Sequence, residues 1–280
     1  MFKTVGVVPR LDSEDALSLA LNIYKYVSSE GLTAIPEVEF ARLKSLRGGV
    51  SLPEMDADLI VTVGGDGTVL KTSMSIPRPE TPILAVNMGR RGYLTEVEPE
   101  NAMKALKMCL LGKYRLEEHA KISAYVEDRK LADSLNEVLI TPATSWKMLT
   151  FNVERDGSKL VEQRADGLIV ATPTGSTAHA FSAGGPILER LIEAFVIAFI
   201  CPSEYVRSMV VSSIKPVQVK IGGPRVKVVV TVDGRYIKQL PPDKPLKIER
   251  SKSKAIFIRF DSPLLSRSYG HPFRLGRSET

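Results

Sequence analysis

The sequence predicts a chain of two domains, an α/β N-terminal domain followed by a mostly β C-terminal domain. The runs 59–63 and 83–87 are apolar at all but one position each, as is typical of strands buried on both faces of a parallel sheet. Beyond Lys113, short strands alternate with turn signals such as Asp156-Gly157 and Asp233-Gly234, a pattern typical of antiparallel hairpins. At 280 residues, the chain is long enough for two domains.

The first domain is expected to span residues 1–112. Residues 4–8 form an apolar β-run, and residues 12–30 carry apolar side chains on one helical face. Asp12 or Ser13 can cap this helix and Gly31 can end it. A second helix is expected over 100–111, because Pro99 marks its start and Gly112 its end.

The second domain is expected to span residues 113–257. Its turn signals include Gly222-Gly223, and the run 226–232 is rich in valine. One helix is expected from about residue 185 to residue 200, where apolar residues recur. A return of the segment from about residue 258 to the first domain is left open, and the polar tail 262–280 is compatible with partial disorder.

Composition narrows the classes of function. The net charge of +6 and the pI of about 9.2 suit anionic substrates, but the basic residues are scattered, so nucleic-acid binding is not expected. The most apolar run, 194–201, is too short to span a membrane, for which roughly 20 residues are needed. Cys109 and Cys201 lie far apart without metal-ligand neighbours, so we expect no disulfide framework and no zinc site, and a cytoplasmic location.

The most informative short motif is Gly64-Gly65-Asp66-Gly67-Thr68, which follows the strand 59–63 directly. Glycines at the carboxyl end of a parallel strand permit positive φ and let backbone N–H groups approach phosphate oxygens. Asp66 would repel a phosphate unless it binds a divalent cation or accepts a proton from an attacking hydroxyl. Either role belongs to phosphoryl transfer, whereas a lone motif of this kind is more simply a tight turn.

Three further segments carry candidate ligand groups. The loop 87–95 also follows an apolar strand, and Asn136-Glu137 could hydrogen-bond the vicinal hydroxyls of a sugar. The long segment 164–186 combines a charged pair, a buried strand, and then hydroxyls and glycines, which lets a flat polar ligand lie against the backbone. Asp166 is placed there to accept hydrogen bonds from an amide or amine. Each segment taken singly is more simply a turn or a loop.

With these motifs in this order, the chain resembles the NAD kinase family over residues 59–235. The matching blocks are Gly-Gly-Asp-Gly-Thr, Asn-Glu, and the segment from Asp166-Gly167 through Thr-Pro-Thr-Gly-Ser-Thr-Ala to Ser-Ala-Gly-Gly-Pro. The resemblance implies a Rossmann-like, phosphofructokinase-like N-terminal domain. It also implies transfer of a phosphoryl group from ATP or inorganic polyphosphate to the 2′-hydroxyl of the adenosine ribose of NAD, giving NADP. A divalent cation, Mg²⁺, and a homo-oligomer, a dimer or tetramer, are expected with it.

The resemblance also assigns roles to residues. Asp66 would be the general base, with Gly67 beside the ligand. Asn136 and Glu137 would hold the ribose, and Asp166 the nicotinamide side. The adenine and ribose surface would be formed by Thr177, Ala178, His179, Ala180, Phe181 and Ser182. Further binding residues are expected at Lys71, Tyr93, Lys147, Arg164 and Arg235.

The chain departs from the family pattern at two positions. The family usually has Tyr where this chain has His179, and many members have Gln where it has Arg235. Since Tyr is the better stacking ring, His179→Tyr is predicted to tighten dinucleotide binding. Arg235 adds a positive charge near the expected dinucleotide, which favours phosphate binding or shifts selectivity.

Three other interpretations of the motifs remain. A lipid or sugar kinase can share Gly-Gly-Asp-Gly, but it lacks the later blocks. A non-catalytic NAD(H)-binding regulator could use the same pocket to sense the ligand, although the presence of Asp66 weighs against it. A structural α/β domain with coincidental glycine loops would not carry four motifs in order.

Overall fold

The computed structural model describes residues 2–89, 92–144, 147–222, 227–240 and 244–261. The described chain divides into two compact units, residues 2–118 with 255–261 (unit 1) and residues 119–254 (unit 2). Strands β5 (Arg115–Val126) and β16 (Leu246–Arg259) have residues in both units. The predicted tail 262–280 lies outside the described residues. Among the described helices, none is long and apolar enough to cross a membrane.

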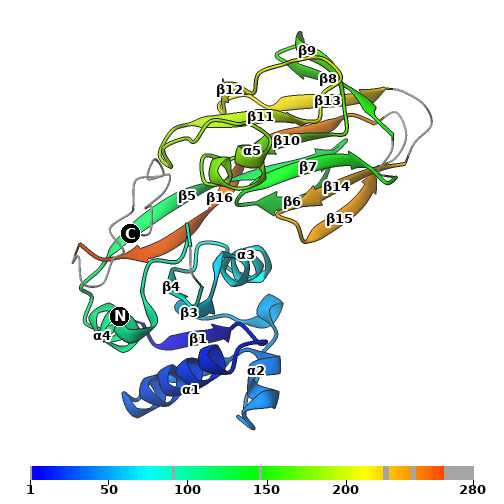
Figure 1. The fold of residues 1–280 in the computed structure, drawn as a ribbon. Helices are drawn as coiled ribbons and strands as arrows, with labels where there is room; N and C mark the ends of the chain where they lie inside the picture. Colours follow the sequence, from blue (N-terminus) through cyan, green and yellow to red (C-terminus); the bar gives the residue numbers. More distant parts are fainter. Residues whose placement is uncertain (1, 90–91, 145–146, 223–226, 241–243, 262–280) are drawn as a thin grey trace, which may run out of the picture. The chain divides into compact units, whose positions relative to one another are not determined.

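Unit 1 is an α/β layer structure built on a parallel sheet, as the sequence predicted (Figure 1). The strands lie in the order β2-β1-β3-β4, with the end of β16 beside β4, and all of these neighbours pair in parallel. The elements are β1 (Thr4–Pro9), α1 (Glu14–Ser29), β2 (Thr33–Pro36), α2 (Val38–Leu43), η1 (Leu52–Glu54), β3 (Leu59–Gly64), α3 (Asp66–Ser75), β4 (Ile83–Asn87), η2 (Pro99–Asn101) and α4 (Ala102–Leu110).

Both faces of the parallel sheet are covered by apolar side chains. On one face, α1 and α4 bury a stripe that includes Ile23 and Leu106 against Val61 and Val86. On the other face, Met55 and Ile76 pack against Ile60. This two-sided burial explains why strands β3 and β4 are mostly apolar, with Thr62 and Asn87 as buried polar exceptions, and it makes the ends of the strands the places where polar groups gather.

The helix predicted over 12–30 is confirmed. Ser13 caps α1, because its side chain accepts a hydrogen bond from the Ala16 N–H at 3.3 Å, and Gly31 follows with φ +76. The helix predicted over 100–111 is also confirmed. It consists of η2, which begins at Pro99, followed directly by α4, which ends at Leu110; Gly112, which follows shortly after, has a φ of +72.

Unit 2 is mostly β. One sheet runs β12-β11-β10-β7-β14-β15, and another set of strands runs β16-β13-β8-β9, with β5 pairing both β16 and β6. The remaining bounds are β6 (Arg129–Ser134), β7 (Glu137–Pro142), β8 (Leu149–Arg155), β9 (Ser158–Ala165), β10 (Gly167–Ala171), η3 (Gly175–Thr177), α5 (His179–Ser182), β11 (Ala194–Ile200), β12 (Met209–Ser212), β13 (Val217–Gly222), β14 (Val228–Val232) and β15 (Tyr236–Leu240).

The turn signals of unit 2 form hairpins as predicted. Asp156 and Gly157 join β8 to β9 with φ 53 and 72, and Asp233 and Gly234 join β14 to β15 with φ 47 and 66. Two successive positive φ values characterise the type I′ turn, for which Asp-Gly is suited. Gly223 and Val226 lie outside the described residues.

The helix predicted over 185–200 is wrong. Ala194–Ile200 is the strand β11, which pairs with both β10 and β12 and is buried along nearly its whole length. A run of seven apolar residues covered on both faces carries no strand alternation, so its periodicity does not separate a strand from a helix. Leu191 and Ile192, expected on the buried face of that helix, are exposed.

Candidate active site

The glycine motif lies at the point where the strand order of unit 1 reverses. The chain goes from β1 to β2 on one side and then to β3 on the other side of β1. In open α/β sheets, ligands bind at the carboxyl ends of the strands at such a switch point. Gly64 ends β3 there, Gly65 is the N-cap of α3, and Asp66 begins that helix.

Close packing rather than positive φ explains the first glycine of the motif. A Cβ on Gly64 would lie 2.3 Å from Thr68 Oγ1 and 2.9 Å from Thr68 Cβ. Gly65 has φ −100, so the expectation of positive φ is not met at this residue. A Cβ on Gly65 would meet no atom of the described protein within 4 Å. The open space beside Gly65, at the start of α3, therefore forms an anion cradle, because the N-terminus of a helix favours negative charge.

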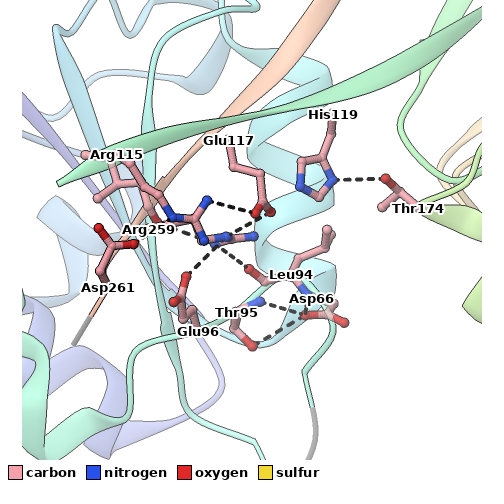
Figure 2. A network of polar contacts seen from close by, with 11 residues as sticks. Asp66, Leu94, Thr95, Glu96, Arg115, Glu117, His119, Thr174, Arg259 and Asp261 are labelled. Carbon is pink, nitrogen blue, oxygen red and sulfur yellow. Dashed lines mark hydrogen bonds and ion pairs between the residues drawn. The ribbon is translucent and has the colours of Figure 1, made fainter. Parts of the chain in front are cut away.

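The Asp66 carboxylate is held by the second predicted loop (Figure 2). Its Oδ2 accepts from the Tyr93 N–H at 2.8 Å, and its Oδ1 accepts from the Leu94 N–H at 3.0 Å and the Thr95 N–H at 3.3 Å. Thr95 Oγ1 donates to Asp66 Oδ1 at 3.4 Å and contacts Asn87 Oδ1 at 3.2 Å. The structure thus brings the two loops together and fixes the orientation of one carboxylate.

The other predicted residues of unit 1 lie on the same segments. Gly67 is exposed in the first turn of α3, Lys71 is half-buried further along that helix, and Tyr93 is exposed. Arg10 directly follows β1 beside the switch point. Its backbone N–H donates to the Val63 carbonyl at 2.8 Å, and its side chain pairs with Asp12.

In unit 2, the Asn136-Glu137 pair is organised by a buried carboxylate that sequence reasoning treated only as a turn residue. Asp233 accepts hydrogen bonds from the Leu135, Asn136 and Glu137 N–H groups at 2.7, 2.8 and 3.0 Å, and from Ser134 Oγ at 2.5 Å. Burial raises the pKa of Asp233, and these four donors act in the lowering direction. The turn after β14 therefore sets the backbone of the Asn-Glu segment.

The Thr-Pro-Thr-Gly-Ser segment packs against the same backbone. Thr172 Oγ1 donates to the Leu135 carbonyl at 2.6 Å, and the Thr172 N–H donates to the Asn136 carbonyl at 2.8 Å. A Cβ on Gly175 would lie 2.1 Å from the Asn136 carbonyl oxygen, so only glycine fits there. The structure thus brings Asn136 and Glu137 together with the start of the segment 172–182.

His179 lies in this group and contacts Glu137 directly. His179 Nδ1 is 2.8 Å from Glu137 Oε1; the His179 side chain is 62% exposed and the Glu137 side chain 4% exposed. Burial raises the pKa of Glu137, the His179 hydrogen bond lowers it, and the Asp233 charge raises it. The second oxygen, Glu137 Oε2, is buried and accepts no hydrogen bond from the described residues.

This contact sharpens the prediction for His179→Tyr. The substitution removes the contact between the largely exposed His179 ring and the buried Glu137 carboxylate, and it adds a better stacking ring, worth about 0.5–1.5 kcal/mol. We therefore expect the Kd for NAD, measured by titration calorimetry, to fall about two- to fivefold. His179→Ala removes both contributions and serves as the matched variant, with a raised Kd. A Kd for His179→Tyr equal to or above the wild-type value would contradict the stacking role.

The remaining residues of this segment surround His179. Thr177 ends η3, and its Oγ1 donates to the Thr174 carbonyl at 3.2 Å. Ala178 is the N-cap of α5, in which Ala180 is buried and Phe181 and Ser182 are exposed. Arg235 is exposed in the hairpin turn that carries Asp233.

Three predicted residues lie elsewhere in unit 2. Asp166 precedes β10, whereas Ala171 at the other end of β10 pairs with Glu137. Asp166 and Ala171 are five residues apart along an extended strand, which corresponds to a distance of about 17 Å. Arg164 is the penultimate residue of β9 and pairs with Thr150 near the start of β8, and the exposed Lys147 shortly precedes β8. The structure therefore groups Lys147, Arg164 and Asp166 at the opposite end of β10 from Asn136 and Glu137.

A buried charge cluster lies behind the Asp66 loop in unit 1 (Figure 2). Arg259 is fully buried, with its Nε 3.1 Å from Glu96 Oε2 and 3.0 Å from Glu117 Oε1. Burial raises the pKa of Glu96 to about 7; Arg259 and Arg115 act in the lowering direction and Glu117 in the raising direction.

The raised pKa of Glu96 predicts a pH-dependent stability. Because the folded-state pKa of about 7 exceeds the ordinary 4.5, the stabilisation is complete below pH 4.5 and is lost as pH rises through 7. Between about pH 5.5 and pH 8.5, we expect the free energy of unfolding to fall by about 2 kcal/mol, since about 1.5 pH units of that window lie below the pKa. Urea unfolding of wild type and Glu96→Gln across this range measures it. A fall of equal size in both proteins would contradict this origin.

The fold and these residues define a class. A parallel sheet with an anion cradle and a fixed carboxylate at its switch point, followed by a β unit with a preformed polar segment, is the framework of a nucleotide-dependent kinase. Residues 5–114 match the model of the ATP-NAD kinase N-terminal domain, and residues 135–260 match that of the ATP-NAD kinase C-terminal domain. The chain belongs to the NAD kinase family.

Relatives and solved structures agree with this assignment. The chain is 38% identical to the NAD kinase of Methanothermobacter thermautotrophicus, covering 91% of each chain. It is 39% identical to that of Thermococcus gammatolerans, over 96% of this chain and 98% of the relative. The structure of an NAD kinase from Archaeoglobus fulgidus in complex with ATP superimposes with a TM-score of 0.74 at 28% identity, covering 92% of this chain and 94% of the other. Yeast NADH kinase complexed with NADH has a TM-score of 0.83 at 21% identity, covering 92% and 83%, which shows the same fold.

Proposed function

We propose that the chain transfers the terminal phosphoryl group of ATP to the 2′-hydroxyl of the adenosine ribose of NAD, giving NADP and ADP. The observation that carries the proposal is the Asp66 carboxylate, held at the start of α3 by the N–H groups of residues 93–95. A base for this reaction must be oriented before the acceptor arrives. The membership in the NAD kinase family supports the choice of NAD as acceptor.

The proton transfer is assigned to Asp66 Oδ2. This oxygen accepts a hydrogen bond from the Tyr93 N–H, and a carboxylate oxygen has a further lone pair for a hydroxyl. As the ribose oxygen forms its bond to phosphorus, its proton moves to Asp66, and the bridging bond to the leaving ADP breaks. A positioned base contributes roughly 10²–10⁴-fold in rate.

Ribose binding is assigned to unit 2. The buried Glu137 Oε2 lacks a donor among the described residues, and a buried carboxylate oxygen gains most from a new hydrogen bond. A ribose hydroxyl is a donor of the required kind. Asn136, whose backbone is fixed by Asp233 and Thr172, supplies the neighbouring amide.

A divalent cation that arrives with the donor phosphates belongs to the same proposal. No group of three or more His, Cys, Asp or Glu side chains that could hold a metal occurs in the part of the chain that the structure describes. Mg²⁺ commonly keeps several waters and takes its other ligands from substrate phosphates. When bound, it neutralises the developing charge on the phosphates, while the start of α3 presents backbone N–H groups to them.

ATP is proposed as the donor because the Archaeoglobus fulgidus relative was solved with ATP, and inorganic polyphosphate remains the alternative donor to be compared. Formation of NADP from NAD and Mg²⁺ with each donor tests the proposal. NADP from ATP supports it. Binding of NAD without NADP from either donor would contradict it and would favour a non-catalytic regulator. A homo-oligomeric state, a dimer or tetramer, and a cytoplasmic location belong to the same proposal, and light scattering measures the former.

The cradle predicts opposite behaviour for two neighbouring glycines. Gly65→Ala places its methyl where no described atom lies within 4 Å, so we expect an unchanged melting temperature and a KM for ATP raised about tenfold, because the methyl fills the phosphate space. Gly64→Ala is the matched variant, which collides with Thr68 and should lower the melting temperature. A wild-type KM in Gly65→Ala would show that phosphates do not approach this glycine.

A further inference from the structure

The buried arginine at the end of β16 has contacts that reach the candidate base. Arg259 is 0% exposed, and its guanidinium lies 5.0 Å from the centroid of the Phe257 ring. A guanidinium in the interior is costly unless its donors are matched. Phe257 pairs with Ile83 of β4, so Arg259 is held on the strand beside the one that leads into the second loop.

The partners of Arg259 include two carboxylates and the backbone carbonyls of Leu94 and its neighbour Ile258. Its Nε is 3.1 Å from Glu96 Oε2 and 3.0 Å from Glu117 Oε1, and its Nη1 donates to the Leu94 carbonyl at 3.4 Å. The planar, forked guanidinium can serve several partners in fixed directions at once, which a lysine ammonium cannot do in the same way.

Leu94 accepts a hydrogen bond from Arg259 and donates another to Asp66. The Leu94 carbonyl faces the guanidinium, and the Leu94 N–H binds Asp66 Oδ1 at 3.0 Å (Figure 2). On either side of Leu94, the Tyr93 and Thr95 N–H groups bind the same carboxylate. Glu96 follows at once, and its N–H donates to the Ala85 carbonyl of β4 at 3.2 Å. The segment 93–96 is therefore fixed by Arg259 on one side and presents its N–H groups to Asp66 on the other.

We propose that Arg259 is a positioning residue for phosphoryl transfer, which holds segment 93–96 in the conformation that orients the Asp66 carboxylate. The inference rests on the proposed role of Asp66 as base. Arg259 does not touch the reactants; it acts through Leu94 and Glu96. Of the other charged groups at the cluster, Arg115 lies 3.3 Å from Glu117 Oε2 and 3.1 Å from Asp261 Oδ1, and both Arg115 and Asp261 are exposed.

The first test is Arg259→Lys, which keeps the charge opposite Glu96 and Glu117 but loses the fork. We expect kcat for NADP formation to fall 10- to 100-fold, while the Kd for NAD stays within twofold, because the ribose-binding residues belong to unit 2. Arg155→Lys is the matched control: it is also a strand arginine that donates to a carbonyl, that of Ser212 at 3.1 Å, and its kcat should remain at the wild-type value. A wild-type kcat in Arg259→Lys would overturn the inference.

A second variant separates positioning from folding. Arg259→Met with Glu96→Gln and Glu117→Gln removes all three charges together, a change that often leaves stability intact, since no buried ion is left alone. The expected result is a folded protein, by circular dichroism and melting temperature, with kcat reduced as in Arg259→Lys. A folded triple variant with wild-type kcat would overturn the inference.

Turnover by the wild-type protein distinguishes a failure of the proposed function from a failure of the positioning role of Arg259. Absence of NADP formation by the wild type would overturn the proposed function and the inference with it. Normal wild-type turnover, together with equal losses of kcat and NAD affinity in Arg259→Lys, would leave the function in place and overturn positioning alone, because a general structural defect affects both quantities.

Discussion

Asp66→Asn is expected to lower kcat for NADP formation by about 10²–10⁴-fold, the range typical of a positioned general base. The amide has nearly the same shape as the carboxylate, and its oxygen can still accept from the Leu94 and Thr95 N–H groups that bind Oδ1 in the wild type. It has no second oxygen for the Tyr93 N–H and cannot take the proton of a hydroxyl. The loss should therefore appear in the chemical step.

The measurement separates catalysis from binding. Steady-state kcat is compared with the Kd for NAD from calorimetry, which should stay within about twofold because Asn136 and Glu137 are untouched. Asp58→Asn is the matched control, since Asp58, the residue before β3 in unit 1, also accepts hydrogen bonds from backbone N–H groups, those of Lys3 at 2.8 Å and Thr4 at 3.0 Å. Its kcat should be unchanged. Retention of more than about a tenth of wild-type turnover in Asp66→Asn would show that another group takes the proton.

Asp233→Asn is expected to destabilise the protein by about 2–3 kcal/mol. The new side-chain NH₂ group would face hydrogen-bond donors that the carboxylate oxygen accepts from in the wild type. Three backbone N–H groups and the Ser134 hydroxyl converge on this carboxylate. The backbone of Asn136-Glu137 should loosen, and we expect the Kd for NAD to rise about tenfold, the equivalent of about 1.4 kcal/mol.

Asp156→Asn provides the control for Asp233→Asn. Asp156 occupies the same position of a type I′ Asp-Gly turn, with φ 53 against 47 for Asp233, but it is exposed and pairs with Lys215. Its substitution should change stability by less than about 0.5 kcal/mol, as for other surface positions. Free energies of unfolding from urea titration and Kd values from calorimetry measure both effects. Similar values for the two variants would mean that the buried cluster does not organise the Asn-Glu segment.

The local sequence predicted those features whose causes are local. The apolar strand before Gly64, the cap at Ser13, and the Asp156-Gly157 and Asp233-Gly234 turns are each set by a few neighbouring residues, and the structure contains all of them. The strand Ala194–Ile200 was mistaken for a helix, because its identity depends on β10 and β12, which flank it in space. An apolar run by itself does not reveal such neighbours.

The positioning of the site residues depends on partners that are distant in the sequence. Asp233 binds Asn136 across 97 positions, and Arg259 reaches Leu94 across 165. The sequence predicted Asp66, Asn136 and Glu137 as ligand groups, but it did not predict which residues orient them. The available signals were a turn aspartate after a valine-rich strand and a single arginine between Ile258 and Phe260 in an apolar strand. Similarly, the position of Asp166 at the opposite end of β10 from Glu137 follows from the register between β7 and β10, which the local sequence does not reveal.

The most direct test of the central claim is the identity of the product formed from NAD, ATP and Mg²⁺ by the purified wild-type protein. Phosphorus NMR locates the new phosphate, and quantification of ADP gives the stoichiometry. We expect a monoester at the 2′-position of the adenosine ribose and one ADP for each NADP. A phosphate at any other hydroxyl, or bound NAD that stays unmodified with both ATP and polyphosphate, would contradict it.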